Sequence, residues 1–289
     1  MSPQAHEASQ IFIELGAAIV SLALLGRLAS RIGFSSIPLY LLLGLAFGNG
    51  GLAPLKVSEE FIHVGAEIGV LLLLFMLGLE YTGEELKHHL RTMLPAGAVD
   101  LALNFPPGLI AGLLLGWSPL ASLLLGGVTY ISSSGIIAKV LAELKRLDEP
   151  ETTSIVSVLV LEDLAMAGPI AEKSQRLLGP LRDLFAATFF FFFGLEIDPK
   201  ALPPVMPVAI ALGVVSALTK VLTGYWAGGR AGLDRRGRIR AGMTLVARGE
   251  FSIVIAGLGA GISPLLGPVA AAYVLFLAVL GPILARVSP

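Results

Sequence analysis

Apolar runs follow one another along almost the whole chain, and most approach the length of about 20 residues that a membrane-spanning helix needs. Irregular backbone cannot face lipid, so such a chain crosses a bilayer as helices or as a closed barrel. We count about ten segments, at 11–28, 34–50, 62–80, 92–116, 119–142, 152–171, 184–197, 203–227, 239–260 and 266–286. Only 14% of the residues are charged, against about 25% in a soluble domain. The chain is therefore predicted to be an all-α polytopic membrane protein.

A single transmembrane domain is expected over residues 1–289, because no stretch between the segments is long enough for an extramembrane domain. Its first half covers 1–171 and its second half 172–289. The clearest expected linkers are Pro203-Pro204 and residues 228–238.

Two adjacent carboxylates, Glu162 and Asp163, lie inside the sixth segment. A charged side chain at the bilayer centre costs about 2.5–3.5 kcal/mol on insertion scales, so such residues are usually functional. The alternative is that both acids lie in the headgroup layer, at the end of a helix. The apolar runs 155–161 and 164–170 on both sides argue against that. We therefore expect the pair to mark a functional site.

Two segments contain polar and glycine residues at membrane depth. The fifth holds Ser132, Ser133 and Ser134 followed by Gly135, and the ninth holds Arg248-Gly249-Glu250. Non-helical backbone inside a bilayer is tolerated only where it is buried in protein or lines a wet cavity. Two interrupted helices in different halves indicate a transporter built from inverted repeats, with its site at the midplane. The alternative for the serines alone is hydrogen bonding between packed helices.

Lys220 lies within the eighth segment. One interpretation is a lysine whose long stem lets the ammonium reach the membrane surface. The other is a buried partner for the midplane carboxylates, because ions inside a membrane are usually paired. We favour the second and expect Lys220 to lie near Glu162 or Asp163.

Several classes of function are disfavoured by the composition. The net charge of −1 gives no reason to expect a nucleic-acid partner, and there is no cysteine for thiol chemistry or metal binding. The four histidines show no metal-ligand spacing, so neither a metal site nor a cofactor is expected: His6, His63, His88 and His89. An intramembrane aspartyl protease needs two carboxylates that converge from different helices, whereas neighbours on one helix point about 100° apart. Glu14, Glu67 and Asp100 show no catalytic context, so an enzyme is not expected.

The chain resembles the bacterial monovalent cation:proton antiporter-2 family over nearly its whole length. The resemblance rests on these motifs in this order: Ile37-Pro38-Leu39-Tyr40-Leu41-Leu42-Leu43-Gly44, Phe47-Gly48, Leu73-Leu74-Phe75-Met76-Leu77-Gly78-Leu79-Glu80, Ser132-Ser133-Ser134-Gly135-Ile136-Ile137-Ala138-Lys139, Glu162-Asp163, Phe193-Gly194-Leu195-Glu196-Ile197-Asp198, Lys220 and Gly249-Glu250-Phe251. Each motif is weak alone, and their order makes the signal strong.

The resemblance implies an inverted-repeat antiporter with two interrupted, crossing helices, forming a homodimer in the inner (plasma) membrane. It implies exchange of sodium or potassium for protons, with Asp163 binding cation and proton in competition. Glu162 and the serines 132–134 would contribute to the ion site, and Lys220, Arg248 and Glu250 would be supporting charges. Removing a carboxylate from water favours its protonated form, so proton and cation become alternatives for one group of oxygens. Coupling then requires that the empty carboxylate cannot cross the bilayer.

The basic residues show one departure from this family, whose members commonly have 12 or 13 spanning segments. With strict alternation, six basic residues of the first half face one side and only Lys56 the other: Arg27, Arg31, Lys87, Arg91, Lys145 and Arg146. Nine of the second half face the opposite side and only Lys200 does not: Lys173, Arg176, Arg182, Arg230, Arg235, Arg236, Arg238, Arg240 and Arg286. The positive-inside rule is thus obeyed within each half and violated between them.

An odd number of helices, about three, inserted near Ala171 would repair this conflict. We therefore predict that the 289-residue chain as written is not a competent antiporter. A non-transporting remnant or sensor with the same fold is the alternative function.

Overall fold

The structure is a computed structural model that describes residues 16–17, 19–29, 31, 37–48, 50–55, 61–62, 64, 83–167, 187–259 and 261–289. Within these ranges the side chains of residues 37, 83–93, 139, 142–143, 163–167 and 250 lie outside the description. All regular structure in the described ranges is helical, as predicted. The chain divides into two compact units, residues 1–73 with 179–203 and residues 74–178 with 204–289.

The first unit contains a helix over Ile19–Ala29, α2 (Ile37–Phe47), a helix over Ala187–Glu196 and the short η1 (Pro199–Ala201). The backbones of α2 and the 187–196 helix touch, because a Cβ on Gly194 would come within 2.6 Å of the Leu41 carbonyl oxygen and 2.9 Å of Gly44 Cα. Glycine at such a crossing is the usual way for membrane helices to approach closely. The predicted segments 11–28, 34–50 and 184–197 thus contain helices. Most of the predicted segment 62–80 lies outside the described residues.

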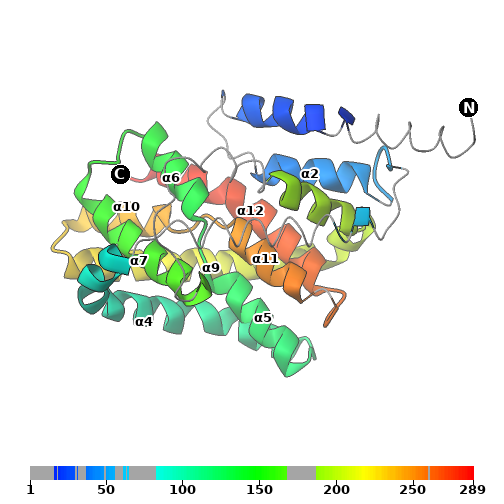
Figure 1. Cartoon of the computed structure of the whole chain (residues 1–289). Helices are drawn as coiled ribbons and strands as arrows, with labels where there is room; N and C mark the ends of the chain where they lie inside the picture. The colour runs from blue at the N-terminus through cyan, green and yellow to red at the C-terminus, as the bar shows by residue number, and fades with distance from the viewer. Residues whose placement is uncertain are drawn as a thin grey trace, which may run out of the picture. The chain divides into compact units, whose positions relative to one another are not determined.

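The second unit carries the remaining helices (Figure 1). They are α4 (Gly83–Leu114), α5 (Pro119–Tyr130), α6 (Ser134–Glu143), α7 (Pro150–Ala167), α9 (Leu202–Arg230), α10 (Arg235–Thr244), α11 (Glu250–Leu258) and α12 (Leu266–Val287). Four described stretches are long and apolar enough to cross a membrane: Leu94–Leu114, Pro119–Ala138, Pro199–Arg230 and Leu266–Val287.

Both expected linkers need correction. Pro203-Pro204 lies in the first turn of α9 rather than between helices, because proline is tolerated there, where its missing N–H would have no helical partner. The 228–238 linker is only residues 231–234, since α9 continues to Arg230 and α10 begins at Arg235. The Asp234 carboxylate caps α10 by accepting a hydrogen bond of 2.8 Å from the Gly237 N–H.

One end of the second unit gathers basic residues from both halves of the chain, and we call it the basic end. Arg146, in the loop between α6 and α7, donates hydrogen bonds to the Ala285 carbonyl (3.1 Å) and the Ser288 hydroxyl (2.8 Å) at the end of α12. Arg240 of α10 pairs with Glu151 at the start of α7, at 3.3 Å. Strict alternation over ten segments would put Arg146 and Arg240 on opposite sides of the membrane.

The basic end also fixes the directions of the helices. The helix α7 starts there and runs away from it, whereas α9 runs toward it, because Arg230 is followed after four residues by α10. The end of α7 and the start of α9 therefore both lie away from the basic end. Residues 168–201, which join these two helices, must then cross a membrane an even number of times or not at all. The sequence offers only one apolar segment there, 184–197. This geometry supports the argument that an odd number of helices is missing.

Candidate functional site

Both predicted interruptions are present, and the two broken helices meet at them. Residues 131–133 separate α5 from α6, and residues 245–249 separate α10 from α11. The Ser133 N–H donates to the Ala247 carbonyl at 3.0 Å, which joins the two breaks directly. The Ser252 hydroxyl of α11 donates to the Val128 carbonyl of α5 at 2.9 Å. Since α6 ends at the basic end and α10 starts there, the two broken helices run antiparallel.

The breaks approach each other so closely that glycine is required at position 249. A Cβ there would lie 2.6 Å from Ser133 Oγ and 2.8 Å from Ser133 Cβ. The neighbouring hydroxyl has its own task, because Ser133 Oγ accepts a hydrogen bond of 3.2 Å from the Ile136 N–H in the first turn of α6. The crossing is thus held by backbone contact and by a local helix cap.

We expect Gly249→Ala to lower the thermal unfolding temperature of the detergent-purified protein. Overpacking of a tight contact costs about 1–3 kcal/mol. The control is Gly261→Ala, because a Cβ at Gly261 would meet nothing within 4 Å. Equal unfolding temperatures for the two variants would contradict the close approach of the breaks.

Arg248 fills the space between the helix ends at the crossing, with 0% of its surface exposed. Its guanidinium donates to the Thr129 carbonyl near the end of α5 (3.1 Å) and to the Leu245 carbonyl just after α10 (3.1 Å). It also donates to the Ser132 hydroxyl (3.2 Å) and the Tyr273 hydroxyl (3.1 Å). Helix C-termini carry unpaired carbonyls and a partial negative charge. The guanidinium satisfies both.

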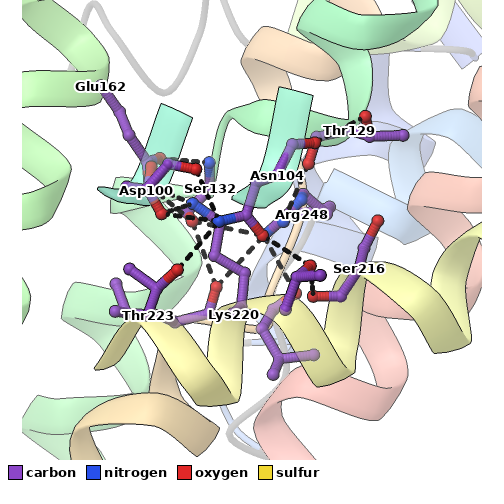
Figure 2. Close-up of polar contacts among 12 residues, drawn as sticks. Asp100, Asn104, Thr129, Ser132, Glu162, Ser216, Lys220, Thr223 and Arg248 are labelled. Carbon is purple, nitrogen blue, oxygen red and sulfur yellow. Dashed lines mark hydrogen bonds and ion pairs between the residues drawn. The ribbon is translucent and has the colours of Figure 1, made fainter. Parts of the chain in front are cut away.

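A second buried cation, Lys220, lies between two carboxylates from different helices. Its Nζ is 2.5 Å from Glu162 Oε1 and 2.6 Å from Asp100 Oδ1, and all three side chains are buried. Figure 2 shows Lys220 extending from α9 toward this group. The predicted proximity of Lys220 to Glu162 is confirmed. The side chain of Asp163, the next residue of α7, lies outside the described residues.

Glu162 connects this charged group to the crossing. The Ser132 N–H donates to Glu162 Oε2, and the Ser132 hydroxyl lies 3.1 Å from Glu162 Oε1 (Figure 2). The same hydroxyl accepts from Arg248. Formal charges on Asp100, Glu162, Lys220 and Arg248 add up to zero, which reduces the cost of burying them in a bilayer. Of the three predicted serines, Ser132 contacts the carboxylate, Ser133 caps α6 and Ser134 begins α6. Glu250 begins α11, and its side chain is not described.

Asp100 is the site residue that the sequence analysis missed. On α4 its Oδ1 accepts from Lys220 and, at 2.9 Å, from the Asn104 amide. That amide also donates to Thr223 at 3.0 Å, and the Thr219 hydroxyl donates to Asn104 Oδ1 at 2.7 Å. Asp100 Oδ2 is buried and finds no hydrogen-bond partner in the part of the chain that the structure describes. An acid and an amide four residues apart within an apolar segment was the available signal.

The two converging carboxylates do not form a protease site. In an aspartyl protease the pair must share a water molecule, but here the Lys220 ammonium lies within 2.6 Å of both carboxylates. The arrangement suits a charge network that holds helices α4, α7 and α9 together beside the crossing.

Two broken helices that cross antiparallel beside a buried charged group define a secondary transporter of the inverted-repeat class. The family model described as "Sodium/hydrogen exchanger, transmembrane" matches residues 17–168 and 166–286. The chain belongs to this family of membrane cation:proton antiporters.

Similar proteins agree with this assignment. The chain is 31% identical to the K(+)/H(+) antiporter subunit KhtU of Bacillus subtilis (strain 168), covering 96% of this chain and 93% of the relative. It is 25% identical to the ammonium/H(+) antiporter subunit AmhT of Alkalihalophilus pseudofirmus, covering 85% and 86%. The solved structure of the sodium proton antiporter MjNhaP1 from Methanocaldococcus jannaschii has the same fold, with a TM-score of 0.63 at 13% identity over 98% of this chain and 99% of that one. These relatives are transporters and not enzymes.

The alignment with KhtU is longer than this chain. It extends over 378 positions, 89 more than the 289 residues here, so at least that many positions have no counterpart in this sequence. The two family matches meet at residues 166–168, next to the predicted junction near Ala171. A length of 89 suits about three spans of about 20 residues with their loops.

Proposed function

We propose that this protein exchanges sodium or potassium for protons by alternating access, with Asp163 binding cation and proton in competition. The observation that carries the proposal is the linkage of α7 to the crossing through Glu162, Ser132 and Lys220. Asp163 follows Glu162 on that helix. The chain would work as a homodimer in the inner membrane of the cell, with the monovalent cation and the proton as its cargo.

The contacts suggest a division of labour between the two carboxylates. Glu162 has both oxygens engaged, by Ser132 and by Lys220, so it anchors α7 to the crossing. The Asp163 side chain leaves the helix about 100° further round. It would therefore present its oxygens at a different place, where cation and proton compete. Unwound carbonyls of the two breaks would replace part of the water shell of the cation, as in transporters with broken helices.

Ser132–Ser134 would then act mainly on the geometry of the site. The Ser132 hydroxyl is shared among Glu162, Leu245 and Arg248, and the Ser133 hydroxyl caps α6. Arg248 and Glu250 would balance the half-helix ends. Coupling follows because an uncompensated carboxylate is too costly to move through the membrane core.

A second candidate function is a remnant or sensor that keeps the fold and does not transport. It is favoured by the 89 unmatched alignment positions and by the connection 168–201, whose single apolar segment does not fit an even number of crossings. Both candidates share the site, and they differ in whether the cycle can run.

We expect vesicles containing the chain as written to show no cation-dependent proton movement above background. The same chain with the unmatched segment of KhtU inserted after Ala171 should show it. Single cysteines at Ser174, which lies outside the described residues, and at Gly237 should label from opposite sides of the membrane in the chain as written. Cytoplasmic labelling of both positions together with robust exchange would show that the argument from charge is wrong.

A further inference from the structure

An open groove of about 520 Å³ lies between α4 and α9 and reaches the first turn of α10. Its apolar lining includes Val99 and Leu103 of α4 and Leu222 of α9, and its other lining includes Tyr225, Trp226, Arg230 and Arg238. We call it the α4–α9 groove. None of these residues takes part in the charged group or in the crossing, so the proposed transport site does not explain them.

The groove runs from acyl-chain depth to headgroup depth. Arg230 lies ten residues beyond Lys220 on α9, which is about 15 Å along the axis. That is half of a hydrocarbon core of about 30 Å. With the charged group at the midplane, Arg230 reaches the headgroups, and Leu222, 58% exposed, faces the acyl chains. Trp226 and Tyr225 then occupy the belt where aromatic residues gather in membrane proteins.

Both arginines of the groove are held against aromatic rings. Arg230 Cζ lies 5.4 Å from the centre of the Trp226 ring, and Arg238 Cζ lies 5.5 Å from that of Tyr225. Arg238 Nε also donates to the Leu233 carbonyl at 3.0 Å. No described carboxylate pairs with either arginine, and the nearby Asp234 carboxylate is used to cap α10. The two guanidinium groups are therefore fixed in place, with their charge not neutralised by a described acid.

We propose that the α4–α9 groove binds one anionic phospholipid. Its phosphate would lie between Arg230 and Arg238, and an acyl chain would cover Val99, Leu103 and Leu222. Arginine pairs with phosphate oxygens through two N–H groups at once. Basic pockets between membrane helices on the cytoplasmic side are known to take anionic headgroups. A neutral phospholipid would fill the apolar part equally well but would gain nothing from the two charges.

Bound lipid would clamp the two helices that carry Asp100 and Lys220. Val99 is adjacent to Asp100, and Leu222 follows Lys220 by two residues. The lipid would thus stabilise the contact between α4 and α9 from the membrane side. This effect does not depend on transport, so it can be measured on the chain as written.

The test is thermal unfolding of the detergent-purified chain with phosphatidylglycerol or with phosphatidylcholine of the same acyl chains, together with native mass spectrometry. Phosphatidylglycerol should raise the unfolding temperature and remain bound, and phosphatidylcholine should do neither. Arg230→Gln with Arg238→Gln should lose most of the shift and the bound lipid. The matched control removes the same charge from exposed neighbours outside the groove, Arg235→Gln with Arg236→Gln, and should keep both.

Three outcomes would overturn the proposal. Equal loss in the two double variants would mean diffuse attraction by a basic surface. Equal stabilisation by the two lipids would mean that the acyl chains alone bind. An equal shift from glycerol 3-phosphate would mean an anion site without a lipid.

Discussion

Asp163→Asn is expected to reduce cation-dependent proton movement to the background of empty vesicles, with expression and unfolding temperature unchanged. Asparagine keeps the size and the hydrogen-bonding atoms of the side chain but can neither release a proton nor neutralise a cation. The variant should be measured in the chain that carries the inserted central segment, where a cycle is possible. Loss of exchange with an unchanged fold is the signature of an ion ligand.

The control for this result is Asp148→Asn, which removes an exposed carboxylate from the loop between α6 and α7. It should leave exchange intact. Normal exchange by Asp163→Asn would rule the site out, and the competing carboxylate would have to be sought elsewhere in the chain.

Lys220→Ala is expected to destabilise the protein more than any other single change discussed here. It leaves Asp100 and Glu162, whose oxygens both lie within 2.6 Å of the lost ammonium, as two buried like charges. Breaking a buried pair costs about 3–5 kcal/mol. Lys200→Ala, at an exposed position, should change stability by less than about 0.5 kcal/mol. Chemical or thermal unfolding in detergent measures both.

A charge-neutralised variant tests the reason for that loss. Adding Asp100→Asn and Glu162→Gln to Lys220→Met should recover much of the stability, because replacing a whole buried ion network by neutral groups is often nearly neutral. Asp100→Asn alone should cost less than Lys220→Ala, since it leaves Lys220 and Glu162 as a one-to-one pair. If Lys220→Ala and Lys200→Ala unfold alike, the charged group does not contribute to stability as described.

The features that could be predicted from the sequence are those that the bilayer enforces. Apolar length marks helices because lipid leaves the backbone few alternatives, and the two breaks and the Lys220–Glu162 pair were predicted because polar groups in lipid need partners. The predicted ion-binding role of Asp163 and the role of Glu250 stay predictions, because these side chains lie outside the described residues.

The rest depended on three-dimensional packing. Asp100 stands alone in its segment, and only the fold brings it 120 residues along the chain to Lys220. The individual roles of the serines also escaped, because composition does not reveal which hydroxyl faces a carboxylate and which caps a helix. Pro203-Pro204 was misread because proline serves equally well in a linker and in the first turn of a helix.

The position of Arg248 has a consequence for how the protein tolerates changing salt. Arginine stays charged at every pH that a cell meets, and this one has 0% of its surface exposed. Mobile ions screen exposed charges over about 8 Å at physiological ionic strength, but they screen buried ones much less. The attraction that joins the broken helices should therefore be the same in dilute and in concentrated electrolyte. An antiporter exposed to large swings in osmolyte and cation content would keep its crossing intact while the ions around it change.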